Sequence, residues 1–141
     1  MMRKLLAAGV GVALWCSAAA AAETGPDPLR GVLPNIDVVM SHQDVLSLTD
    51  AQRTAIVTHA LAAQSRFPAA QHKLEAAVGK LVDALRPGRV DQSRALAQLD
   101  GVLARERDVK RLQMTLMIEV KNQLTPEQQA KAFQLAAAGS K

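Results

Sequence analysis

The segment Arg86-Pro87-Gly88-Arg89 separates the two longest helical patterns of this sequence. Adjacent proline and glycine mark a turn, because proline cannot donate a backbone hydrogen bond and glycine adopts backbone angles that other residues avoid. Two helices joined by so short a turn must pack antiparallel. We therefore expect the centre of the fold to be a helical hairpin whose tip is this segment.

The stretch before the turn has the pattern of one long helix that begins after Thr49. Thr49 and Gln52 have the spacing of a capping box, in which each side chain binds the backbone of the other residue. Pro68 interrupts the stretch and is expected to kink or break the helix. Apolar residues recur on both sides of it at helical spacing. They are Ile56, Ala60, Ala63, Phe67, Leu74, Val78, Leu81 and Leu85.

The stretch after the turn predicts a straight helix, because no proline occurs between Arg89 and Thr125. Asp91 is the expected N-cap. A helix from there to Gln123 would be about 50 Å long, at about 1.5 Å per residue. Its apolar face comprises Ala95, Leu99, Val102, Val109, Leu112, Leu116 and Val120.

Two shorter helices are expected to flank the hairpin. Asn35 can cap the first, which we predict to run as far as Leu46. The second starts after Thr125, has Pro126 at its first helical position and ends near Ala138. No segment shows the alternation typical of a strand. The sequence therefore predicts an all-α protein, a long antiparallel helical hairpin with short flanking helices.

The N-terminal segment has the three parts of a secretory signal peptide. Arg3 and Lys4 provide positive charge, an uncharged apolar run follows, and Ala20-Ala21-Ala22 is a small-residue cleavage pattern. An uncleaved membrane anchor is the alternative, since the run has about the length of a span, but its weakly apolar end favours cleavage. We predict a periplasmic protein with no membrane span after cleavage. The predicted organisation is signal peptide 1–22, flexible leader 23–34 and helical domain 35–141.

Composition excludes several classes of function. The only cysteine, Cys16, lies in the predicted signal peptide, so the remaining chain cannot form a disulfide. Nucleic-acid binding is not expected, because the net charge falls from +4 to about +2 without the two signal-peptide cations, and Phe67 and Phe133 are the only aromatic residues left. The chain has no metalloprotease motif, phosphate-binding loop or nucleophile elbow. We expect neither an enzyme nor a bound cofactor.

A single alanine-rich hairpin buries only one stripe of each helix. Without disulfides, a domain of this size built in that way would be marginally stable. Pairing with a second copy is the simplest remedy, and we therefore expect a homodimer.

The form L-T-x-x-Q occurs twice in the chain. Capping chemistry alone explains the threonine and the glutamine, so the further information lies in the leucine, the repetition and the placement. One copy opens the kinked helix and the other follows the straight one. The motif residues are Leu48, Thr49 and Gln52 in the first copy and Leu124, Thr125 and Gln128 in the second.

This pattern resembles the LTxxQ family of periplasmic proteins, which includes the chaperone Spy, the stress protein CpxP and the metal-linked ZraP and CnrX. The resemblance covers roughly residues 35–138. It implies a helical hairpin that dimerises into a curved cradle. It also implies one of two functions: ATP-independent protection of unfolded or misfolded envelope proteins, or the binding and sensing of heavy metals such as zinc, copper or nickel. A membrane stress sensor is a further partner consistent with the family.

A mixed basic and apolar cluster on the second long helix is the candidate client-binding surface. On its own, such a cluster is typical of an ordinary solvated helix face. Within the family fold it becomes a surface that could hold unfolded chains, which expose both apolar segments and carboxylates. The residues are Arg105, Arg107, Val109, Lys110, Arg111, Leu112 and Met114.

Metal ligands are sparse, with Met40 and His42 as weak candidates. The metal-sensing branch of the family has a second histidine one helical turn after the first, where this chain has Leu46. That branch also has a histidine and a methionine before the second motif, where this chain has Leu116 and Val120. We therefore expect no dedicated metal site and favour the chaperone function, with metal binding as the alternative.

Overall fold

The computed structural model describes residues 28–139, and the regular elements in this range are α-helices without any strand. The predicted signal peptide, residues 1–22, lies outside the described residues, as does the leader up to residue 27. Residues from Leu33 onward form one compact unit, which the following paragraphs describe. No helix within the described range is long and apolar enough to cross a membrane. The helices are α2 (Ile36–Ser41), α3 (Asp50–Leu85), α4 (Gln92–Gln123) and α5 (Pro126–Ala138).

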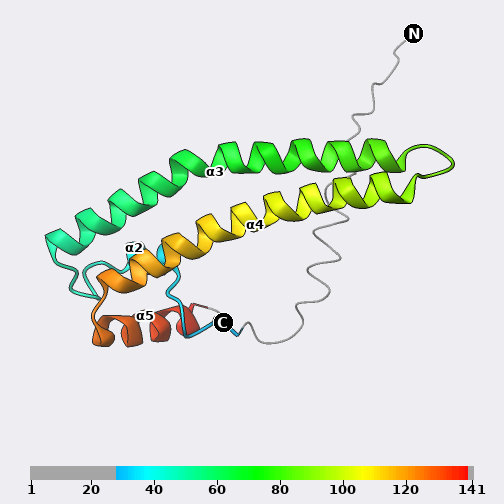
Figure 1. Ribbon diagram of the computed structural model, residues 1–141. Coiled ribbons are helices and arrows are strands. Elements are labelled where there is room, and N and C mark those ends of the chain that lie inside the picture. Colours follow the sequence, from blue (N-terminus) through cyan, green and yellow to red (C-terminus); the bar gives the residue numbers. More distant parts are fainter. Residues whose placement is uncertain (1–27, 140–141) are drawn as a thin grey trace, which may run out of the picture. The chain divides into compact units, whose positions relative to one another are not determined.

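Helices α3 and α4 form the predicted antiparallel hairpin (Figure 1). The backbone amide of Arg94 donates to the side chain of Asp91, which caps α4 as expected. Helix α3 continues through Pro68 instead of breaking there, and Figure 1 shows a bend in its middle. One proline removes only one hydrogen bond, and packing against α4 on both sides of it keeps the helix continuous. The predicted all-α hairpin is thus confirmed.

The short helix α2 ends at Ser41, earlier than the predicted end at Leu46. The chain from residue 42 to residue 47 forms turns, and Ser47 adopts the left-handed conformation with φ 53°. This turn lets both Leu46 and Leu48 point into the core, where each is buried. A continued helix would rotate these two residues, which are two positions apart, by about 200° relative to each other.

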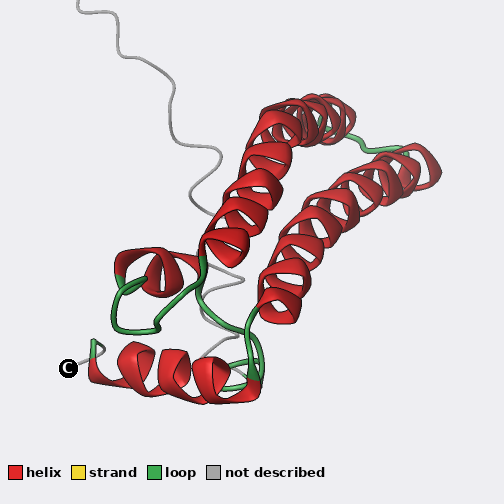
Figure 2. Cartoon of the chain, turned by 90° about the vertical axis from the view of Figure 1, so that its left-hand side faces the viewer, coloured by secondary structure: helices red, strands yellow, loops and turns green. Residues whose placement is uncertain are grey.

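The main hydrophobic cluster lies at one end of the hairpin, opposite the turn at residues 86–89. Figure 2 shows α2 and α5 together at this end, beside the start of α3 and the end of α4. Ile36, Met40, Leu116 and Leu135 pack against the core from its edge. A few further residues, Leu81, Ala84, Ala95, Val102 and Val109, are buried between α3 and α4 along the rest of the hairpin. Along α3, no residue between Ile56 and Leu81 is fully buried. The core residues are Val39, Leu46, Leu48, Ile56, Val120, Leu124 and Ala132.

Candidate functional site

The two L-T-x-x-Q motifs form complete capping boxes. In the first, the Gln52 amide donates to the Thr49 hydroxyl at 3.1 Å, and the Thr49 amide donates to the Gln52 side chain at 2.9 Å. In the second, the backbone amide of Gln128 donates to the Thr125 hydroxyl at 3.2 Å, and the backbone amide of Thr125 donates to the Gln128 side chain at 2.9 Å. Each motif therefore starts a helix, α3 in one case and α5 in the other.

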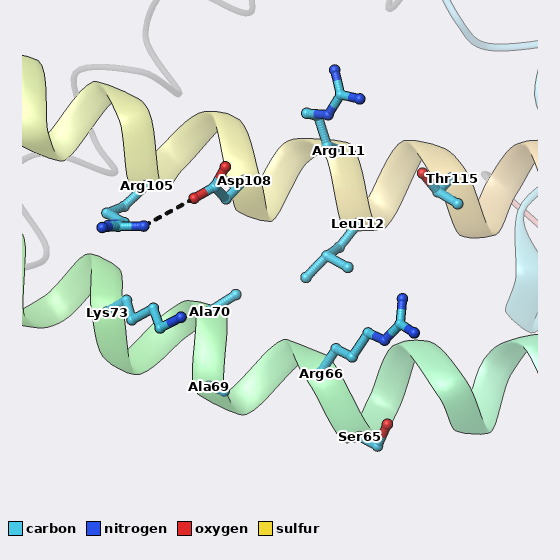
Figure 3. A pocket seen from close by; sticks show the side chains of 10 residues that line it. All are labelled: Ser65, Arg66, Ala69, Ala70, Lys73, Arg105, Asp108, Arg111, Leu112 and Thr115. Atoms are coloured by element: carbon cyan, nitrogen blue, oxygen red, sulfur yellow. Dashed lines mark hydrogen bonds and ion pairs between the residues drawn. The ribbon is translucent and has the colours of Figure 1, made fainter.

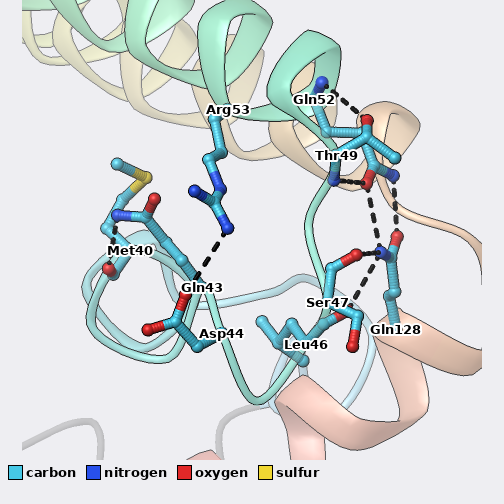
Figure 4. Close-up of polar contacts among 9 residues, drawn as sticks. All are labelled: Met40, Gln43, Asp44, Leu46, Ser47, Thr49, Gln52, Arg53 and Gln128. Atoms are coloured by element: carbon cyan, nitrogen blue, oxygen red, sulfur yellow. Dashed lines mark hydrogen bonds and ion pairs between the residues drawn. The ribbon is translucent and has the colours of Figure 1, made fainter.

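The two motif glutamines also bind each other, although they are 76 positions apart. Gln52 Nε2 donates to Gln128 Oε1 at 2.7 Å, and Gln128 Nε2 donates back to Gln52 Oε1 at 3.1 Å (Figure 4). Each amide nitrogen also reaches the backbone just before the other motif. Gln52 Nε2 donates to the Gln123 carbonyl at 2.6 Å, and Gln128 Nε2 donates to the Leu46 carbonyl at 3.1 Å.

The glutamine pair thus joins the start of α3 to the start of α5, next to the end of α4. Leu48 and Leu124, the leucines of the two motifs, are buried in the core. The motif residues therefore serve to fix the base of the hairpin and leave the long helices free to form a surface.

An open groove lies between α3 and α4 in the middle of the hairpin (Figure 3). Its volume is about 590 Å³. Small and apolar side chains form part of the lining, among them Ala69 and Ala70 of α3 and Leu112 of α4. The groove therefore combines apolar side chains with charged ones in one open lining.

Positive charge dominates the lining of this groove. Four of the side chains that line it are cations, and Asp108 is the only anion among them. Asp108 Oδ2 lies 3.3 Å from Arg105 Nη1. No ion pair within residues 28–139 involves the other three cations, so the lining carries an excess of three positive charges. The four cations are Arg66, Lys73, Arg105 and Arg111.

A smaller apolar slot of about 270 Å³ adjoins the groove along the same two helices. Phe67 of α3 and Leu116 of α4 line it, and Leu112 lines both the slot and the groove. One leucine therefore has a basic surface on one side and an apolar recess on the other. We call the basic groove and this slot together the mid-hairpin site.

The structure places only part of the predicted client-binding cluster at the mid-hairpin site. Arg105, Arg111 and Leu112 line the groove. Val109 is only 7% exposed and packs inside the hairpin. The remaining three, Arg107, Lys110 and Met114, line neither part of the mid-hairpin site.

Two lining cations on the facing helix, Arg66 and Lys73, were not predicted. Their spacing of seven residues places them on one face of a helix, and the small residues Ala69 and Ala70 lie between them. Two cations and two small residues on one helix face were thus the signal in the sequence for this half of the groove. The signal was insufficient by itself, because the groove also requires the facing residues of α4.

The weak metal candidates have structural roles. Met40 packs against the core, and His42 Nδ1 lies 2.9 Å from the Val38 carbonyl oxygen. His59 Nδ1 lies 3.1 Å from Glu119 Oε2 and links α3 to α4. Across the described part of the chain, no group of three or more histidine, cysteine, aspartate or glutamate side chains is arranged to hold a metal ion.

Comparison with known families gives a match over residues 4–131, to a family described as heavy-metal resistance. The chain belongs to the heavy-metal resistance family. This family consists of periplasmic proteins of the LTxxQ type, so the predicted resemblance is confirmed. Comparisons with curated proteins and with solved structures gave no match. The heavy-metal resistance family includes relatives of both the chaperone kind and the metal-linked kind, so membership alone leaves both functions open.

Proposed function

We propose that this protein is a periplasmic, ATP-independent chaperone of the Spy/CpxP type that holds unfolded envelope proteins at the mid-hairpin site. The observation that carries the proposal is the composition of this site, where unpaired cations and apolar side chains share one open lining. A surface that is both basic and apolar can hold many unfolded sequences weakly, because such chains expose aliphatic segments together with carboxylates.

Further aliphatic side chains are exposed on both long helices, outside the lining of the mid-hairpin site. Each of the residues concerned has between 40% and 59% of its surface exposed. They are Val57 and Leu61 on α3 and Leu96, Leu103 and Ile118 on α4.

The test is aggregation of a chemically unfolded protein, diluted into buffer without ATP, with and without a several-fold excess of this protein. Protection is expected for the parent. Leu112→Gln should weaken it, because the substitution places a polar group between the groove and the slot. Val90→Gln is the matched control, since Val90 lies at the hairpin tip and lines neither part of the site. The absence of protection by the parent would refute the proposal.

We further propose that the protein acts as a homodimer. The main hydrophobic cluster lies at one end of the hairpin, and along the rest of it only a few side chains are buried while large aliphatic residues stay exposed. Sedimentation of the purified protein at micromolar concentration should give about twice the monomer mass. A stable, fully helical monomer under the same conditions would contradict this expectation.

Metal binding is the second candidate function, because the matched family is described as heavy-metal resistance. We expect titration calorimetry with zinc, copper or nickel to show no tight stoichiometric site, because the metal-ligand types are scattered across the described residues. His42→Ala and His72→Ala provide a matched pair of variants. Tight binding that His42→Ala abolishes and His72→Ala preserves would establish metal binding instead.

A further inference from the structure

We infer that the groove of the mid-hairpin site selects client segments that carry two or more carboxylates about three residues apart. This inference rests on the proposed chaperone function and names the class of segment that the groove prefers. It starts from the excess of positive charge in the groove lining.

The cations come from both helices and are held near one another by the hairpin. In Figure 3, the side chains of Arg66, Lys73 and Arg105 lie between the two helices, while Arg111 points away from α3 on the other side of α4. Arg66, Lys73 and Arg111 have no ion-pair partner among the described residues. Mutual repulsion of these charges is relieved when anionic groups enter the groove, and arginine binds carboxylates with two parallel hydrogen bonds.

The spacing of the cations favours an extended peptide over a small anion. Arg66 and Lys73 are seven residues apart on one helix face, which corresponds to about 10 Å along the axis. A chain in the polyproline II conformation, which unfolded chains commonly adopt, covers about 9 Å in three residues and brings side chains three positions apart to the same side. Two carboxylates at that separation can contact both cations at once, whereas a single small anion is too short to span the distance between Arg66 and Lys73.

The apolar part of the lining explains why the partner is a peptide with aliphatic character. Ala69, Ala70 and Leu112 lie in the groove lining, where a segment bridging the two carboxylates would pass. A highly hydrated polyanion gains nothing from these side chains, whereas an aliphatic side chain of a client loses exposed surface there.

The test uses three labelled peptides of equal length and identical apolar residues. One carries paired glutamates three positions apart, one has glutamines at those positions and one has lysines. Fluorescence anisotropy with the purified protein should show the glutamate peptide binding roughly tenfold more tightly than the glutamine peptide. The lysine peptide should bind most weakly. Raising the salt concentration should reduce the difference, because the Debye length falls to about 3 Å at 1 M.

The double variant Arg66→Glu/Lys73→Glu should remove the preference for the glutamate peptide. Arg86→Glu/Arg89→Glu makes the same change in net charge at the exposed hairpin tip and should keep the preference. A milder pair, Arg66→Gln/Lys73→Gln, replaces the first variant if circular dichroism shows that the charge reversal disturbs the helices.

Equal affinity of the parent for the glutamate and glutamine peptides would overturn the inference. Equal loss of the preference in the groove and tip variants would also overturn it, because net charge alone would then be responsible. Tight binding of pyrophosphate or of anionic vesicles, without preference for the glutamate peptide, would assign the groove to phosphate groups instead. Protection against aggregation without any peptide preference would leave the proposed function standing and refute only the selectivity.

Discussion

Ile56→Ala is expected to lower the free energy of unfolding by about 2–5 kcal/mol, the range for large-to-small changes in a packed core. The Ile56 side chain is completely buried and contacts the cluster to which all four helical elements contribute. Because this cluster is small, few neighbouring side chains can move into the cavity that the substitution leaves. Urea denaturation followed by circular dichroism measures the loss.

Leu61→Ala is the matched control for this prediction. Leu61 lies on the same helix, five residues further along, and is 59% exposed. It should therefore cost less than about 1 kcal/mol, because most of its surface is already in contact with water. Equal losses in the two variants would show that the core does not lie at the base of the hairpin.

Gln52→Glu is expected to destabilise the protein by about 1–3 kcal/mol, although glutamate is as good as glutamine in a capping box. The introduced carboxylate can still accept from the Thr49 amide. It cannot donate to the Gln123 carbonyl or to Gln128 Oε1, which Gln52 Nε2 contacts at 2.6 and 2.7 Å. Both acceptors would face a negative charge in a partly buried position.

Thr49→Ala separates the capping contribution from the contact between the motifs. It removes the hydroxyl acceptor of the box and leaves the glutamine pair in place, so a loss of about 1 kcal/mol is expected. In a double-mutant cycle, Gln52→Ala and Gln128→Ala should show a coupling energy of at least about 0.5 kcal/mol. Additive effects of these two substitutions would contradict a direct contact between the glutamines.

Local sequence patterns predicted the helices well, because capping and periodicity act over a few residues. Both capping boxes, the cap at Asp91 and the turn at residues 86–89 are found where the pattern placed them. The end of α2 at Ser41 could not be predicted in this way. It depends on burying Leu46 and Leu48 together, which is a demand of the tertiary core and not of the helix.

Contacts between distant segments were beyond the reach of the sequence pattern. The pairing of Gln52 with Gln128 requires the hairpin to close, and nothing in either motif encodes the other's position. The groove is a similar case. A run of basic residues on α4 was visible in the sequence, but helical rotation places Arg107 and Lys110 outside the lining, and the facing Arg66 and Lys73 belong to another helix.

The position of the main hydrophobic cluster at one end of the hairpin has a consequence for backbone opening. Amide protons near Ile56 and Val120 should exchange with solvent only when the whole domain unfolds, because the packed cluster encloses both residues. Towards residues 86–89, amides need only a local separation of two helices, and their protection should fall progressively. The two helices would then separate locally and reversibly at the tip of the hairpin, while its base stays packed. The mid-hairpin site lies between these two regimes, where brief separations of α3 and α4 would change the width of the groove without loss of the fold.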